Sequence, residues 1–114
     1  MSDQSSDQTQ LINQEQPNAE EVLQRAWLHL AKKELVEAEM DFRQVLELNN
    51  QYADAYYGLG LANLELGHRD TAKSDFDQAL DLINSHLIKE KPQRGTVLRN
   101  LTISQIRMLD NEGL

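Results

Sequence analysis

The sequence predicts an all-α fold, a solenoid of two helix-turn-helix hairpins followed by a fifth, C-terminal helix. Three observations predict this class. Apolar residues recur at helical spacing along most of the chain, and a stretch of 34 residues repeats with polar as well as apolar matches. No run of about 18 apolar residues occurs. A membrane-spanning helix is therefore not expected.

Residues 1–17 are predicted to form a disordered polar tail. Gln, Ser and Asp dominate this segment, and Leu11 and Ile12 form its only adjacent pair of large aliphatic side chains. Such a composition buries too little apolar surface to offset the entropy of ordering the chain. A helix is expected to begin after Pro17, because Asn18 followed by Glu21 is typical of a capping box.

Four helices follow from the apolar spacing. Residues 18–52 are predicted to form the first hairpin and residues 53–86 the second. Gly67 is expected to end the third helix, since glycine takes the left-handed conformation without steric cost. The third helix is expected at residues 56–66. The apolar side of the first helix is Ala19, Val22, Leu23, Ala26, Trp27 and Leu30, that of the second is Ala38, Phe42, Val45, Leu46 and Leu48, and that of the fourth is Ala72, Phe76, Ala79, Leu80 and Leu82.

An internal repeat supports the two hairpins. When residues 19–52 are laid over residues 53–86, nine positions are identical at a spacing of 34. Two unrelated amphipathic helices would match in apolar class but hardly in Asp, Gln and Asn as well. The identical pairs are Ala19/Ala53, Leu30/Leu64, Ala38/Ala72, Asp41/Asp75, Phe42/Phe76, Gln44/Gln78, Leu46/Leu80, Leu48/Leu82 and Asn50/Asn84.

The repeat resembles the tetratricopeptide repeat (TPR) family. The family pattern of aromatic, Leu-Gly, aromatic, Ala, Phe and Ala reads here as Tyr56, Leu59-Gly60, Asn63, Ala72, Phe76 and Ala79. The first unit is a weaker copy, with Arg25 where the family usually has Leu and Lys33 where it has Gly. The resemblance covers residues 19–86 and implies a right-handed superhelical TPR solenoid. Arg25 suggests that the first helix has a solvated outer side.

The resemblance also implies a concave groove that binds other polypeptides. The family's groove positions fall on apolar and aromatic side chains in both repeats, namely Leu23, Trp27, Leu30, Tyr57, Leu61 and Leu64. Members that bind the acidic tails of heat-shock chaperones carry Lys and Asn here. This sequence has Leu23, Trp27, Gly58 and Leu61 at the clamp positions, so chaperone tails are not expected as partners.

The remaining segments are a linker at residues 87–94, a fifth helix at residues 95–110 and a tail at residues 111–114. The fifth helix is apolar on more than one face, through Val97, Leu98, Leu101, Ile103, Ile106, Met108 and Leu109. A terminal helix in a repeat array usually has a polar outer side. This helix is therefore expected either to enter the groove or to make a dimer contact. The Leu11-Ile12 pair is another candidate for filling the groove.

Catalytic and metal sites are not expected. The chain has no cysteine, and His29, His68 and His86 lie in different elements without ligand spacing. The carboxylates are expected at solvent-facing helix positions, and Gly58 and Gly60 are explained by close packing rather than by a phosphate loop. No cofactor is expected. The absence of cysteine fits a reducing compartment and a cytoplasmic protein.

The charge distribution offers a second interaction surface. The chain carries a net charge of −8, yet residues 85–107 hold five basic side chains against Glu90, a local charge of +4. The rest of the chain therefore carries −12. The net charge of −8 argues against nucleic acid as a partner, because binding it requires Lys and Arg to neutralise phosphates. The basic residues Lys89, Lys91, Arg94 and Arg99 are candidates for docking an acidic partner, or they are simply solvated.

These observations predict a protein-interaction adaptor that captures an apolar helix or peptide in its groove. Two alternatives stay open. One is a self-associating unit, a homodimer with the C-terminal helix of one copy in the groove of another. The other is a regulatory subunit that docks an acidic partner through residues 89–99.

Overall fold

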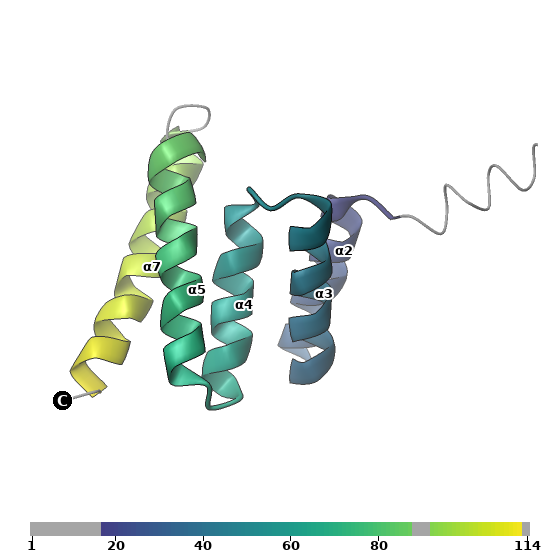
Figure 1. Ribbon diagram of the computed structural model, residues 1–114, viewed down its shortest axis with the longest axis horizontal. Coiled ribbons are helices and arrows are strands. Elements are labelled where there is room, and N and C mark those ends of the chain that lie inside the picture. Colours follow the sequence, from purple (N-terminus) through teal and green to yellow (C-terminus); the bar gives the residue numbers. More distant parts are fainter. Residues whose placement is uncertain (1–16, 88–91, 113–114) are drawn as a thin grey trace, which may run out of the picture.

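The computed structural model describes residues 17–87 and 92–112. Except for Pro17, the predicted tail of residues 1–17 lies outside this part of the chain, as do Leu11 and Ile12. Within the described residues, five α-helices lie side by side along the molecule (Figure 1), and there is one π-helical turn. They are α2 (Ala19–Ala31), α3 (Leu35–Leu48), α4 (Ala53–Glu65), α5 (Arg69–Leu82), η1 (Ile83–Leu87) and α7 (Pro92–Glu112).

The helices form two adjacent hairpins and a terminal helix. Helix α2 packs on α3, and α4 packs on α5. Helix α3 joins the hairpins by packing on α4, while α7 packs on α5 and η1. The predicted all-α architecture of two hairpins and a fifth helix is confirmed.

The first helix begins where the capping box predicts. The Asn18 side chain accepts a hydrogen bond from the Glu21 backbone N–H at 2.8 Å. The reciprocal contact differs from a standard capping box, because the Asn18 side-chain amide, rather than its backbone N–H, donates to Glu21 Oε1 at 2.9 Å. One orphan donor of the first turn is thus satisfied by the side chain.

Two phenylalanine rings, one from α3 and one from α5, pack against α4 at positions that have no side chain. Phe42 and Phe76 are fully buried. A Cβ added at Gly58 would lie 2.3 Å from the Phe42 ring, and one added at Gly60 would lie 2.5 Å from Phe76. Both glycines are therefore required for the close approach of a helix backbone to an aromatic ring.

The two hairpin turns occupy equivalent positions with different residues. Lys33 has φ of 64° and Gly67, the residue 34 positions later, has φ of 89°. Gly67 ends α4 at no steric cost, as predicted. Lys33 holds the same left-handed conformation with a side chain, which costs about 1–2 kcal/mol.

The end of the second hairpin differs from the prediction. Residues 83–87 continue α5 as a π-helical turn, and α7 begins at Pro92 instead of residue 95 and extends to Glu112 instead of residue 110. Proline suits the first turn of a helix because its φ is already helical and its missing N–H has no partner there. The predicted linker of residues 87–94 is therefore shorter, and its residues 88–91 lie outside the described part. Of the predicted tail, residues 111–112 are helical and residues 113–114 are not described.

Helix α7 covers the open side of the second hairpin with one of two apolar stripes. Leu98, Thr102 and Leu109 are buried. The Arg69 guanidinium donates to the Leu109 carbonyl at 3.2 Å, and Lys73 pairs with Asp110 at 2.7 Å. The second stripe, formed by Val97, Leu101 and Met108, is about half exposed.

Candidate functional site

A groove opens between the first helices of the two hairpins. Its cavity of about 410 Å³ is lined by apolar side chains of α2 and α4, by charged residues at one end and by one residue of α7. The volume is in the range of small-molecule and peptide side-chain pockets. The lining residues are Trp27, Leu30, Ala31, Lys33, Leu61, Leu64, Glu65 and Gln105.

The structure brings four of the six predicted groove residues to the cavity wall. Trp27, Leu30, Leu61 and Leu64 line it. Leu23 and Tyr57 retain only 4% and 8% of their exposure and belong to the two core clusters. Neither lines the cavity, because Leu23 packs with residues of α3 and α4 and Tyr57 packs with Leu98 and Leu109 of α7.

Aromatic rings connect the two hairpins beneath this groove. The Trp27 ring meets Phe42 edge-on with centroids 4.9 Å apart, and it lies 6.4 Å from Tyr57. Tyr57 in turn lies 5.7 Å from Phe76. Trp27 thus lines the cavity and also packs on Phe42 in the core of its own hairpin, so the core fixes the position of this groove residue.

An ion pair crosses one end of the groove. The Lys33 ammonium at the turn of the first hairpin contacts Glu65 at the end of α4. The Lys33 side chain is 70% exposed and that of Glu65 is 37% exposed, so solvent screens the pair and it contributes little to stability. Sequence reasoning noted Lys33 only as a departure from glycine, and it did not find Glu65.

Helix α7 supplies a wall of the groove through Gln105. The burial of Tyr57 raises the pKa of its hydroxyl, and a hydrogen bond with the Gln105 side chain acts in the opposite direction. The other end of that amide, Gln105 Oε1, is buried and has no hydrogen-bond partner among the described residues. No signal in the sequence pointed to Gln105, since α7 has no counterpart in the repeat.

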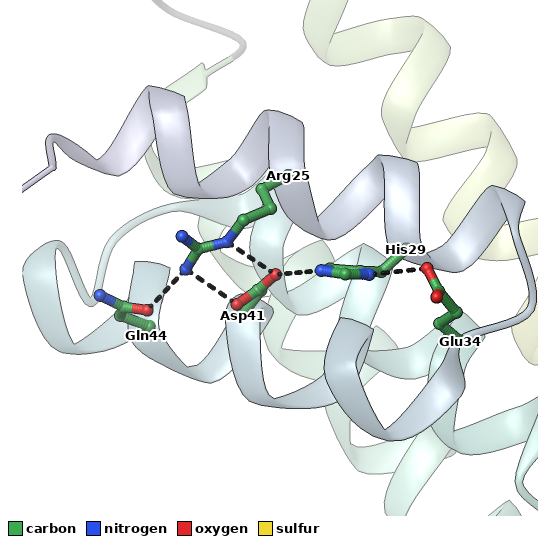
Figure 2. Close-up of polar contacts among 5 residues, drawn as sticks. All are labelled: Arg25, His29, Glu34, Asp41 and Gln44. Carbon is green, nitrogen blue, oxygen red and sulfur yellow. Dashed lines mark hydrogen bonds and ion pairs between the residues drawn. The ribbon is translucent and has the colours of Figure 1, made fainter.

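A chain of polar side chains ties α2 to α3 (Figure 2). Arg25 donates two hydrogen bonds to the Asp41 carboxylate, at 3.1 and 3.0 Å, and a third to Gln44 at 3.1 Å. The two ring nitrogens of His29 face Glu34 at 2.9 Å and Asp41 at 3.4 Å. The first helix was predicted to have a solvated side at Arg25. The Arg25 side chain is 49% exposed, but its guanidinium is bound to Asp41 and is not free in solvent.

The second hairpin repeats this arrangement with fewer charges. Asn63 replaces His29 and donates to the Asp75 carboxylate at 2.9 Å, while His68 Nδ1 lies 3.3 Å from Asn63 Oδ1. Burial raises the pKa of Asp75, against the opposing effect of the Asn63 hydrogen bond. Asp41 and Asp75 are buried rather than solvent-facing as expected. In both hairpins a buried aspartate of the second helix is thus held by a polar side chain of the first helix at equivalent positions, which indicates a structural role.

Only two of the four predicted basic docking residues lie in the described part of the chain. Arg99 is exposed on α7, and Arg94 lies in the first turn of the same helix. Lys89 and Lys91 lie outside the described residues. Docking of an acidic partner through this segment stays a prediction.

Metal binding and membrane insertion find no support in residues 17–87 and 92–112. No group of three or more His, Asp or Glu side chains there could hold a metal ion. None of the described helices is long and apolar enough to cross a membrane.

Stacked helical hairpins with a groove along their first helices define a helical-repeat protein. The family model of the tetratricopeptide repeat matches residues 53–86, which form α4 and α5. That hairpin is a tetratricopeptide repeat, and α2 and α3 form an equivalent hairpin beside it. No curated protein matches the chain. Tetratricopeptide repeats mediate protein–protein interaction and are typically non-catalytic.

Proposed function

We propose that the chain is an adaptor that binds an apolar helix or peptide of another protein in the groove. The observation that carries this proposal is the open cavity, walled by Trp27, Leu30, Leu61 and Leu64 and left unfilled by the described residues. A concave apolar surface with an aromatic anchor is the usual form of a peptide-binding site.

The position of α7 supports an open groove. Its buried stripe is directed at α5 and η1, and only Gln105 reaches the cavity. This arrangement supports an open groove over the alternative in which the helix fills the groove of its own chain. The charged groups at the groove are Lys33 and Glu65, which pair with each other. Acidic chaperone tails remain unsupported as partners, and a cytoplasmic setting fits the absence of cysteine.

A blocking substitution tests the proposal. Ala31 is exposed at the cavity wall near the end of α2, so Ala31→Arg should obstruct the groove without disturbing the core. A basic residue is also favourable at a helix C-terminus. Linear random peptides displayed on phage should be enriched by the wild-type chain, and the selected peptides should bind Ala31→Arg at least tenfold more weakly.

Trp27 provides the readout, because it is the only tryptophan of the chain and lines the cavity. Selected peptides should change its fluorescence on titration. Asn111→Arg, an exposed change on α7 away from the lining residues, is the matched control. Failure to enrich any peptide, or equal affinity for wild type and Ala31→Arg, would refute the groove model.

A second candidate is self-association through α7. The exposed stripe of Val97, Leu101 and Met108 carries no charge, and depletion of charge with enrichment of Met is typical of interface cores. Leu101→Asp places a charge on this stripe at a position that is 47% exposed.

Sedimentation velocity at increasing concentrations tests this candidate. The wild-type chain should show concentration-dependent dimers, and Leu101→Asp should remain monomeric with unchanged helicity. A wild-type chain that sediments as a monomer throughout the concentration series contradicts self-association.

A further inference from the structure

The unpaired amide oxygen of Gln105 distinguishes the groove wall on the α7 side. This atom is buried and has no hydrogen-bond partner among the described residues. Buried polar side-chain atoms are nearly always paired, because an unpaired acceptor has lost its water without gaining a donor. The adjacent end of the same amide is engaged with the Tyr57 hydroxyl. A missing donor is therefore the feature of this site that needs explanation.

The location of Gln105 indicates where such a donor can come from. Its side chain lines the cavity together with Trp27, Leu61 and Leu64. The side chain as a whole is only partly buried, and the terminal torsion of glutamine is broad. Rotation about this torsion, which gives up the contact with Tyr57, can therefore present the oxygen to the cavity without moving α7.

We propose that the occupant of the groove is an extended peptide segment that donates a backbone N–H to Gln105 Oε1. This inference rests on the proposed function and narrows it to one class of partner. Apolar side chains of the segment lie against Trp27, Leu30, Leu61 and Leu64, while its backbone follows the α7 wall. Gln105 acts as a residue that selects for peptide conformation.

The requirement for a free N–H favours an extended segment over a helix. In a helix every backbone N–H beyond the first turn already donates to the carbonyl four residues earlier. In an extended chain successive N–H groups point to alternate edges, and one edge is free to pair with a side-chain amide. Apolar contacts alone do not discriminate between these two forms.

Charge complementarity defines the partner further. Outside residues 85–107 the chain carries a charge of −12. The Lys33 ammonium, the one cation among the residues that line the cavity, is already paired with Glu65. An acidic segment would thus be repelled and would find no free cation at the groove. The expected occupant is an extended apolar segment that is neutral or basic.

A double-mutant cycle between protein and peptide tests the hydrogen bond. The probe is the tightest-binding linear peptide from the display selection above, synthesised with a single N-methyl group at each backbone position in turn. One position should lose at least tenfold in affinity for the wild-type chain, measured by Trp27 fluorescence. The same N-methyl peptide should lose no more than twofold on Gln105→Met, which has already lost the oxygen.

Controls separate this inference from the proposal on which it rests. Ser104→Ala, an exposed neighbour on α7, should show the same N-methyl sensitivity as the wild type. Gln105→Ala replaces Gln105→Met if the latter does not reach wild-type helicity. An N-methyl effect of equal size on wild type and Gln105 variants, or no effect at any position, overturns the hydrogen bond but leaves groove binding intact. A display selection that yields no binding peptide overturns both.

Discussion

Asp75 is the residue whose burial has the clearest energetic consequence. Its carboxylate lies inside the second hairpin and receives a hydrogen bond from Asn63. The equivalent Asp41 receives two hydrogen bonds from Arg25. Leu59 stands at the Arg25 position in the second hairpin, so α4 offers Asp75 no guanidinium, and Arg43 of α3 acts on it only through its charge. The same repeat position therefore holds a carboxylate that is paired with a guanidinium in the first hairpin, and one that is hydrogen-bonded only to a neutral amide in the second.

The first prediction concerns the pH dependence of stability at Asp75. Burial raises its pKa, so the folded chain binds more protons than the unfolded chain above the ordinary pKa of about 4. The contribution of Asp75 to the free energy of unfolding therefore decreases as pH rises through that region. Asp75→Asn removes this titration and retains an acceptor for Asn63. Its stability relative to wild type should increase between pH 3 and pH 7.

Urea denaturation at a series of pH values measures this difference. The exposed Asp81 lies on the same helix, and Asp81→Asn should show no comparable trend. Curves for Asp75→Asn and wild type that run parallel across the series would contradict the raised pKa.

Helix α4 illustrates how one element serves both hairpins. Its glycines admit Phe42 from the preceding hairpin and Phe76 from its own. Its outer side carries Leu61 and Leu64 to the groove. The element is thus constrained by core packing on some faces and presents apolar side chains to the groove on another.

The second prediction is the cost of a single methyl group at Gly58. Alanine is about 1 kcal/mol better than glycine in a helix interior. Its Cβ, however, would lie 2.3 Å from the buried Phe42 ring. Gly58→Ala should therefore reduce the free energy of unfolding by about 1–3 kcal/mol, as overpacking does elsewhere.

A double mutant identifies the cause of that loss. Combining Gly58→Ala with Phe42→Leu removes the ring edge that the methyl group meets, so the two losses should be less than additive in chemical denaturation. Full additivity would place the effect of Gly58→Ala somewhere other than the contact with Phe42.

Much of the fold was predictable at the level of elements, whereas the site was predictable only in part. The 34-residue repeat predicted α2 to α5 because helix packing imposes small or aromatic residues at fixed positions such as Gly60 and Phe76. The repeat could not place α7, which has no copy to compare with. The burial of Tyr57 and the role of Gln105 both depend on that placement, so both were missed.

At the scale of the whole molecule, α7 completes the core of the second hairpin. Leu98 and Leu109 join a buried cluster with Phe76 and Ile83. Two repeats are fewer than the roughly three that such arrays need for stability. The terminal helix thus replaces the missing neighbour, and the same helix supplies a wall of the groove.

The third prediction compares two leucines of α7. Leu98 is 8% exposed and Leu101 is 47% exposed. Leu98→Ala should lower the free energy of unfolding by about 2–5 kcal/mol, a large share of the stability of a small domain. Leu101→Ala should change it by less than about 0.5 kcal/mol. Thermal or urea denaturation by circular dichroism at low protein concentration measures both, and equal losses would contradict the assignment of the buried stripe.

The π-helical turn η1 also determines where the repeat can grow. A third unit in the 34-residue register would begin at residue 87, but α7 begins at Pro92, five residues later. Helix α7 is therefore out of the 34-residue register that α2 and α4 share. The register between the hairpins is intact ahead of Ile83, so a further 34-residue unit inserted there would keep it. Such an enlarged protein would keep α7 and Gln105 at its end and gain groove surface in its middle.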